Sequence, residues 1–172
     1  MSYLLIYLRK SIRADLKQFP VHIKNILVPH AGTVLGDKAL SYAIKIAKPS
    51  GATINILHAV EPFPSSPMIF AKKQDIQMQK ELAQTEKALM QDIKEELQNR
   101  ADYCRKKSIN ANSIVVKGRP EDEILKYSKK HHVDLIIMAK RRKVPGIRGM
   151  LRLGSVSRKI LEISDKPVLI LE

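Results

Sequence analysis

Residues 25–57 read NILVPHAGTVLGDKALSYAIKIAKPSGATINIL, and this stretch decides the fold class. It begins with a short apolar run, Ile26 to Val28, which a proline ends and which predicts a buried strand. Between Asp37 and Lys48 the apolar residues recur every three or four positions, so an amphipathic helix is expected there. Pro49-Ser50-Gly51 ends that helix, and residues 52–57 predict a second strand. A strand, a helix and a strand in this order indicate a parallel pair.

The rest of the chain continues the alternation. After a Pro-rich connector at 61–67, residues 72–107 keep helical spacing without Gly or Pro, which predicts one long helix. Further strands are expected at 113–116, 134–138 and 167–171, with helices that begin at Pro120 and, capped by Ser155, near residue 155. The strands are apolar throughout, so both of their faces should be buried. The sequence therefore predicts an α/β fold: a single-domain, Rossmann-like, five-stranded parallel sheet with helices on both faces.

This architecture also predicts where a ligand would bind. In open parallel sheets, ligands lie beyond the carboxyl ends of the strands, where the strand order reverses. The two loops expected there are residues 29–36, after the first strand, and residues 139–154, after the fourth. His30 lies in the first of these loops, where a titrating or ligand-contacting role is one interpretation. His58, which follows the second strand, is expected to be a packed core histidine.

Positive charge is concentrated in two segments. The formal net charge of the chain is +14. Residues 139–159 contain eight basic residues and no acidic one, and residues 1–24 contain five basic residues and one acidic residue. The first segment includes the expected ligand loop, which makes it a candidate site for a polyanion, although a solvated surface loop is the alternative. Aromatic residues make up only 5% of the chain and no recognition helix is evident, so sequence-specific nucleic-acid binding is not expected.

Several classes of protein are disfavoured. Cys104 is the only cysteine, which excludes an intramolecular disulfide and a cysteine metal cluster, and the five histidines lack the spacing of a zinc site. No metal is therefore predicted. No apolar run reaches the roughly 18 residues needed to span a bilayer, and the apolar start of the chain lacks the flanks of a secretory signal. These features predict a cytoplasmic protein.

Residues 1–23 form an N-terminal basic amphipathic extension, distinct from the domain expected over residues 24–172. The apolar residues of the extension lie on one face of a helix: Leu4, Leu5, Leu8, Ile12, Leu16 and Phe19. Such a helix can contact an anionic membrane surface. The alternatives are a helix packed on the domain or on a dimer partner, and an extension that results from a misplaced start codon.

Five segments in order resemble the universal stress protein family: Ile26-Leu27-Val28-Pro29, Leu57-His58-Ala59-Val60, residues 134–138, Leu153-Gly154-Ser155-Val156-Ser157 and Lys166-Pro167-Val168-Leu169-Ile170. The resemblance covers residues 24–172. It implies a five-stranded α/β fold, a homodimer formed through the C-terminal strand from Pro167 to Leu171, and a cytoplasmic role in the stress response. The resemblance does not decide whether this chain binds an adenine nucleotide, because some members of the family bind ATP and others do not.

The nucleotide-binding motif of the family is degenerate in this sequence. ATP-binding members carry an Asp where this chain has Ala31, and two glycines where it has Ala139 and Arg142. The loop before Gly154-Ser155 is also two residues longer. Glycines let the backbone approach phosphate closely, so their loss changes the site, but a guanidinium group is itself a good phosphate ligand.

The residues and the family resemblance together lead us to expect a non-catalytic protein similar to the universal stress proteins, which binds ATP, another adenine nucleotide or a different anionic ligand between the two loops. The candidate binding residues are Pro29, Ala31, Ala59, Met138, Ala139, Arg141, Arg142, Gly154, Ser155 and Val156. Two alternatives stay open. One is an interaction module without a small ligand, which the basic loop and the N-terminal helix recruit to anionic membrane or nucleic acid. The other is a weak ATPase, which the absence of an evident general base disfavours.

Overall fold

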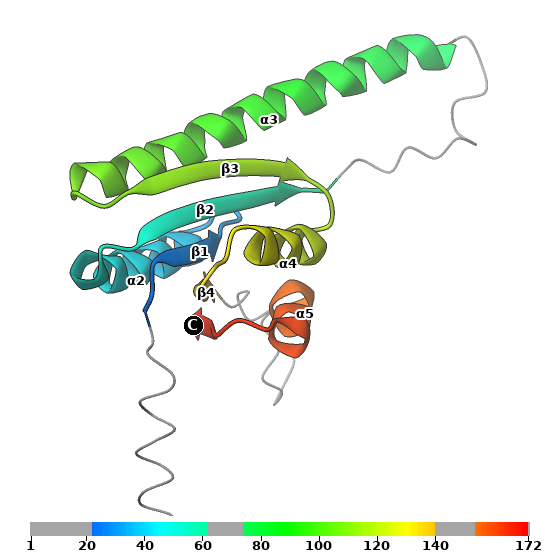
Figure 1. Ribbon diagram of the computed structural model, residues 1–172. Coiled ribbons are helices and arrows are strands. Elements are labelled where there is room, and N and C mark those ends of the chain that lie inside the picture. Colours follow the sequence, from blue (N-terminus) through cyan, green and yellow to red (C-terminus); the bar gives the residue numbers. More distant parts are fainter. Residues whose placement is uncertain (1–21, 62–73, 140–153, 172) are drawn as a thin grey trace, which may run out of the picture.

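The computed structural model describes residues 22–61, 74–139 and 154–171 (Figure 1). Strands and helices alternate along these residues. The strands are β1 (Asn25–Pro29), β2 (Thr53–Val60), β3 (Ala111–Lys117), β4 (Leu135–Ala139) and β5 (Val168–Leu171). The helices are α2 (Val34–Ser50), α3 (Gln74–Lys106), α4 (Pro120–Lys130) and α5 (Ser155–Ile163). The predictions for residues 1–21, including the amphipathic helix, lie outside the described residues.

All five strands form one parallel sheet with the order β3-β2-β1-β4-β5, which confirms the predicted fold. The central strand β1 pairs with β2 on one side, where Ile26 lies opposite Ile54. On its other side β1 pairs with β4, where Leu27 lies opposite Ile136. The chain first builds outward from β1 to β3 and then returns to add β4 and β5. The strand order therefore reverses between β1 and β4, where the sequence places the ligand loops.

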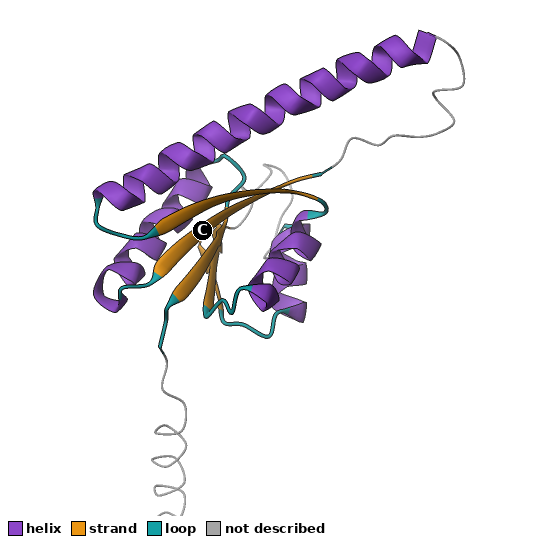
Figure 2. Cartoon of the chain, turned by 45° about the horizontal axis from the view of Figure 1, so that its top comes forward, coloured by secondary structure: helices purple, strands orange, loops and turns teal. Residues whose placement is uncertain are grey.

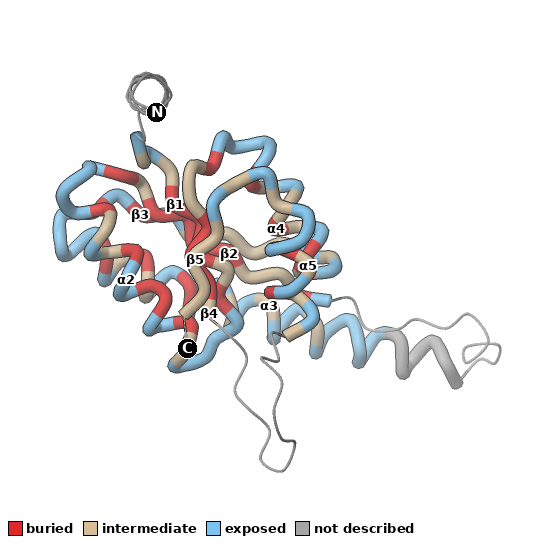
Figure 3. The backbone as a smooth tube through the Cα atoms, turned by 90° about the horizontal axis from the view of Figure 1, so that it is seen from below, coloured by how far each residue is buried: buried red, intermediate tan, exposed pale blue. Residues whose placement is uncertain are grey.

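Helices cover both faces of the sheet (Figure 2). On one face, α2 and α3 bury Ala39, Leu40, Ala43, Leu97, Ala101 and Cys104 against alternate strand residues such as Ile26, Ile54 and Ile137. On the other face, Ile124 of α4 and Ile160 of α5 pack with Leu27, Leu57 and Ile136. Each central strand thus supplies side chains to both cores, which explains its continuous apolar sequence. Figure 3 shows this burial concentrated along the central strands.

Helix α2 begins three residues earlier than the sequence predicts, because Thr33 caps it. The Gly36 N–H donates to Thr33 Oγ1 at 3.2 Å, which satisfies one of the free amides of the first turn. The spacing of apolar residues does not predict this first turn, because Val34 is 84% exposed and does not contribute to the buried face of the helix. At the other end, Pro49 still belongs to the last turn, and Gly51 ends the helix in the left-handed conformation.

The predicted cap of α5 is wrong by one residue. Gly154 is the N-cap, Ser155 is the first helical residue, and no side chain caps this end by a hydrogen bond. Ser155 is exposed. Its hydroxyl is therefore not used to close the helix, contrary to the sequence-based expectation.

Helix α3 extends well beyond the sheet (Figure 1). Its second half packs on β3 and β2 through Leu97, Ala101 and Cys104, which are at most 1% exposed. Earlier along the helix, Leu82 and Leu89 are each 40% exposed. Within the described residues, no helix is both long and apolar enough to cross a membrane.

Candidate functional site

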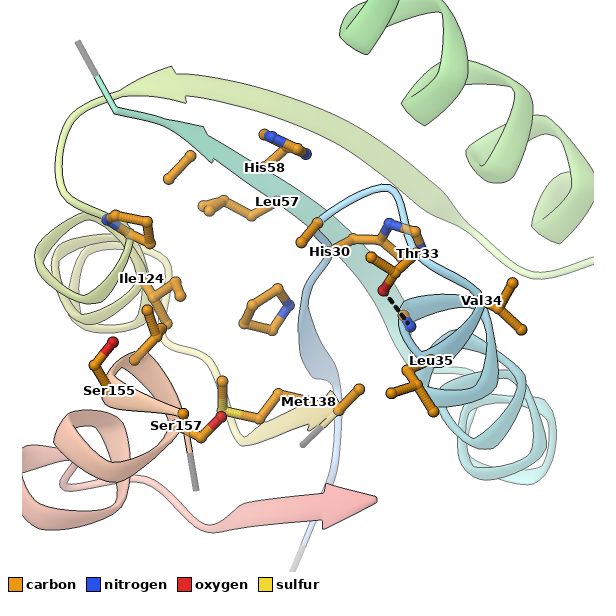
Figure 4. A pocket seen from close by; sticks show the side chains of 18 residues that line it. His30, Thr33, Val34, Leu35, Leu57, His58, Ile124, Met138, Ser155 and Ser157 are labelled. Carbon is orange, nitrogen blue, oxygen red and sulfur yellow. Dashed lines mark hydrogen bonds between the residues drawn. The ribbon is translucent and has the colours of Figure 1, made fainter. Parts of the chain in front are cut away.

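A cavity of about 760 Å³ opens at the carboxyl ends of β1 and β4, at the reversal of the strand order (Figure 4). Thr33, the N-cap of α2, and Leu35 of α2 lie on one side of it. Ile124 of α4 and Ser155 of α5 lie on the other side. The volume is in the range of small-molecule sites, which is about 300–1,000 Å³.

Each predicted site residue that the structure describes lines this cavity: Pro29, Ala31, Ala59, Met138, Ala139, Gly154, Ser155 and Val156. They come from the ends of β1, β2 and β4 and from the start of α5. Arg141 and Arg142 lie outside the described residues. The fold thus brings together segments that are more than a hundred residues apart in the sequence.

Several other residues line the cavity that were not among the predicted binding residues: Thr33, Leu35, Pro120, Ile124 and Ser157. A usable signal existed for Pro120, which begins the helix after β3 and so belongs to the same edge of the sheet. Ile124 lies one turn further along α4 and is 2% exposed. Leu35 belongs to no motif, and Ser157 ends a segment that resembles the family but was not predicted to bind a ligand.

The start of α5 is the polar end of the cavity. In this helix the first intrahelical bond runs from the Arg158 N–H to the Gly154 carbonyl. The amides of Ser155, Val156 and Ser157 precede that bond and have no acceptor within the helix. Free amides at a helix N-terminus, together with the helix dipole, favour an anion. The rest of the described wall is mostly apolar, with Leu57, Ile124 and Met138 among its side chains.

His30 is a buried polar residue of this wall, and its side chain is fully enclosed. Its Nδ1 accepts a hydrogen bond from the Gly32 N–H at 3.1 Å, so Nε2 carries the proton and donates to Asp37 Oδ1, also at 3.1 Å. Burial lowers the pKa of His30, and the nearby Arg100 guanidinium lowers it further, while Asp37 acts in the opposite direction. The ring is thus held neutral, with both nitrogens already bonded.

Asp37 connects this loop to the long helix. Arg100 of α3 donates from Nε to Asp37 Oδ1 at 2.8 Å and from Nη1 to the Glu96 carbonyl at 3.1 Å. Burial alone would raise the pKa of Asp37, but the hydrogen bond and charge of Arg100 lower it overall. The loop that carries Ala31 is therefore tied to both α2 and α3.

His58 is half-buried at the end of β2, in agreement with the expected packed histidine. Among the described residues, its Nδ1 is the one buried side-chain nitrogen or oxygen without a hydrogen-bond partner. Burial lowers its pKa, so a neutral ring is favoured. No cluster of three or more metal-binding side chains occurs within the described parts of the chain.

Comparison with known proteins gives consistent matches. A family model described as "Universal stress protein family" matches residues 22–172. The universal stress protein YxiE of Bacillus subtilis is 29% identical over 154 residues, which cover 84% of this chain and 96% of that protein. The solved structure of MJ0577, a protein of Methanocaldococcus jannaschii, matches with a TM-score of 0.69 and 24% identity, over 88% of this chain and 96% of that chain.

Two similar structures contain nucleotides. A universal stress protein from Archaeoglobus fulgidus in complex with dAMP has a TM-score of 0.57 and 16% identity, over 89% of this chain and 100% of that chain. A universal stress protein in complex with cAMP has a TM-score of 0.58 and 22% identity, over 88% of this chain and 98% of that chain. At these identities the structural likeness establishes the fold.

Proposed function

The chain belongs to the universal stress protein family, and from this premise we propose that it binds an adenine nucleotide in the cavity between the β1–α2 loop and the start of α5. One observation carries the proposal: an apolar cavity lies at the reversal of the strand order and ends at the first amides of α5, which have no acceptor within the helix. An adenine ring needs an apolar wall, and a phosphate needs the amides. Two proteins of the same fold are in complex with adenine nucleotides.

The degenerate motif limits which residues can contact the phosphate groups. Ala31 lines the cavity without the carboxylate that the family resemblance leads one to expect at this position. Ser155 supports phosphate contact, since no capping bond engages its hydroxyl. We therefore assign recognition of the phosphate groups to Gly154, Ser155 and Val156.

We propose binding without turnover. A general base has to accept a proton from the attacking water. Both nitrogens of His30, which lines the cavity, are already bonded to Asp37 and to the Gly32 amide. Asp37 in turn accepts from Arg100. These contacts prevent His30 from acting as that base, which favours a binding protein over a weak ATPase.

Calorimetric titration tests the proposal, with adenosine, AMP, cyclic AMP, ATP and inorganic phosphate added to protein from which any co-purified ligand has been removed. We expect saturable binding of at least one nucleotide. Ser155→Asp should weaken it at least about tenfold, because the new carboxylate repels phosphate while it suits the helix N-terminus. Thr85→Asp, on the exposed surface of α3, is the matched control and should bind as the wild type does. Silence for all five compounds would refute the proposal.

We also propose that the protein pairs as a homodimer through β5. This strand bonds to β4 along one edge, and β4 is its only partner strand in the described sheet. Its four apolar residues are each half-buried, so pairing with a second copy would cover them further. Sedimentation of the full chain should give a dimer, and Leu171→Lys should give a monomer. A wild-type monomer at micromolar concentration would exclude this assembly.

A further inference from the structure

Four charged side chains form a closed ring beside the cavity. Arg119 Nη2 lies 2.8 Å from Glu121 Oε1, and Lys159 Nζ lies 3.6 Å from the same oxygen. Lys159 Nζ also lies 2.9 Å from Asp122 Oδ1, and Arg119 Nε lies 3.8 Å from Asp122 Oδ2. Two cations and two carboxylates thus alternate around the ring, and its net charge is zero.

The ring joins the two helices that border the polar end of the cavity. Glu121 and Asp122 lie in the first turn of α4, next to Pro120, which lines the cavity. Lys159 comes from α5, four residues after Ser155 and therefore on nearly the same face of the helix. Four residues correspond to about 6 Å along a helix axis, which is less than the screening length of about 8 Å at physiological salt.

The two carboxylates are ionised at neutral pH. A hydrogen bond with its own backbone lowers the pKa of Glu121, and the charges of Arg119 and Lys159 lower it further, whereas burial opposes them. The hydrogen bond from Lys159 lowers the pKa of Asp122. Without the two cations, a double negative charge would stand in the first turn of α4, next to the cavity residue Pro120.

We propose that Lys159 is a positioning residue for the anionic part of the ligand: through its contacts with Glu121 and Asp122 it neutralises the entrance beside α5. This inference rests on the proposed nucleotide binding. Lys159 acts on the ligand through the two carboxylates and does not itself touch it. The gain in affinity should therefore increase with the number of phosphate charges and be absent for an uncharged nucleoside.

Titration of the full chain with adenosine, AMP and ATP tests this role. In Lys159→Gln we expect an unchanged Kd for adenosine, a Kd for AMP raised about twofold, and a Kd for ATP raised about fivefold or more. The matched control is Lys126→Gln, which removes the same charge from α4 at a residue that pairs with Glu123, outside the ring. Its nucleotide affinities should follow the wild type.

A second variant separates electrostatics from packing. Asp122→Asn combined with Lys159→Gln removes one charge of each sign and should restore most of the ATP affinity. If Lys159 only held α4 and α5 together by packing, the double variant would not regain ATP affinity. The single variant would then lose affinity for adenosine and for ATP to the same extent. Either result would overturn the inference. If Lys159→Gln binds adenosine and ATP with the same affinities as the wild-type protein, only this inference fails. If the wild-type protein binds none of the three compounds, the proposed function itself fails.

Discussion

At the scale of single residues, the packing of His30 sets what the start of α2 tolerates. A Cβ added at Gly36 would lie 2.8 Å from His30 Nε2. Gly36→Ala gains about 1 kcal/mol of helix propensity, but overpacking a rigid buried ring costs about 1–3 kcal/mol, so the free energy of unfolding should fall. The loss should vanish in a His30→Ala background, where the space is free. Urea unfolding of both pairs measures this coupling, and equal losses in both backgrounds would contradict it.

The buried imidazoles also predict how stability depends on pH. The pKa of His30 and that of His58 are both lowered from 6.5, chiefly by burial, so the unfolded chain binds protons more readily than the folded chain. The free energy of unfolding is then unaffected by these histidines above pH 6.5. Below this value it declines as the pH falls, by at most about 1.4 kcal/mol per pH unit for each histidine. Urea unfolding between pH 7.5 and 5 should show this decline. His30→Gln should reduce its slope; an unchanged slope would assign the effect to other groups.

The position of a residue in the fold could be predicted where chain order alone decides it, and could not where two residues compete for one role. Gly154 and Ser155 are both acceptable N-caps, so the sequence could not tell which of them precedes the helix. Ala31, Ala59 and Met138 could be placed at one site because each follows the end of a parallel strand. Leu35 lies in the predicted ligand loop 29–36 but was not predicted as a binding residue, because its position depends on the first turn of α2, which the periodicity does not contain.

At the scale of elements, the two halves of α3 should contribute very differently to stability. Leu97 is 1% exposed within the core, whereas Leu82 is 40% exposed on the part that extends beyond the sheet. Leu97→Ala should lower the free energy of unfolding by about 2–5 kcal/mol, and Leu82→Ala by less than about 0.5 kcal/mol. Chemical denaturation of both variants provides the comparison. A similar loss in both would show that a partner covers the first half of the helix in solution.

Element boundaries were predicted less well than element order, for a physical reason. Strand β2 continues to Val60, three residues past its apolar run, because β3 pairs with it as far as Lys117. Such pairing is a long-range contact that local periodicity does not contain. The first residue of helix α4 was predicted correctly, because Pro120 and the three acidic residues after it are local signals of a helix start.

At the scale of the whole molecule, the position of the excess charge decides what it does. Eight of the basic residues lie within 139–159, a segment that begins at the cavity residue Ala139 and includes the start of α5. Charge spread evenly over a surface would favour polyanions in general. Basic residues that directly follow a cavity residue in the sequence should instead act on the ligand in that cavity, and mainly on its phosphates.

We expect ATP binding to depend on salt, and two arginines to contribute most to that dependence. Arg141 and Arg142 follow Ala139 closely in the sequence, and Arg142 stands where the family motif has a glycine. Between about 50 and 300 mM salt, the Kd for ATP should rise several-fold while the Kd for adenosine stays constant, because salt screens charge. Arg141→Gln with Arg142→Gln should weaken ATP binding and flatten its salt dependence. The control pair, Arg148→Gln with Arg152→Gln, removes the same charge later in the segment and should have the smaller effect. Equal effects of the two pairs would mean that the segment attracts ATP by its total charge, without a specific contact from Arg141 or Arg142.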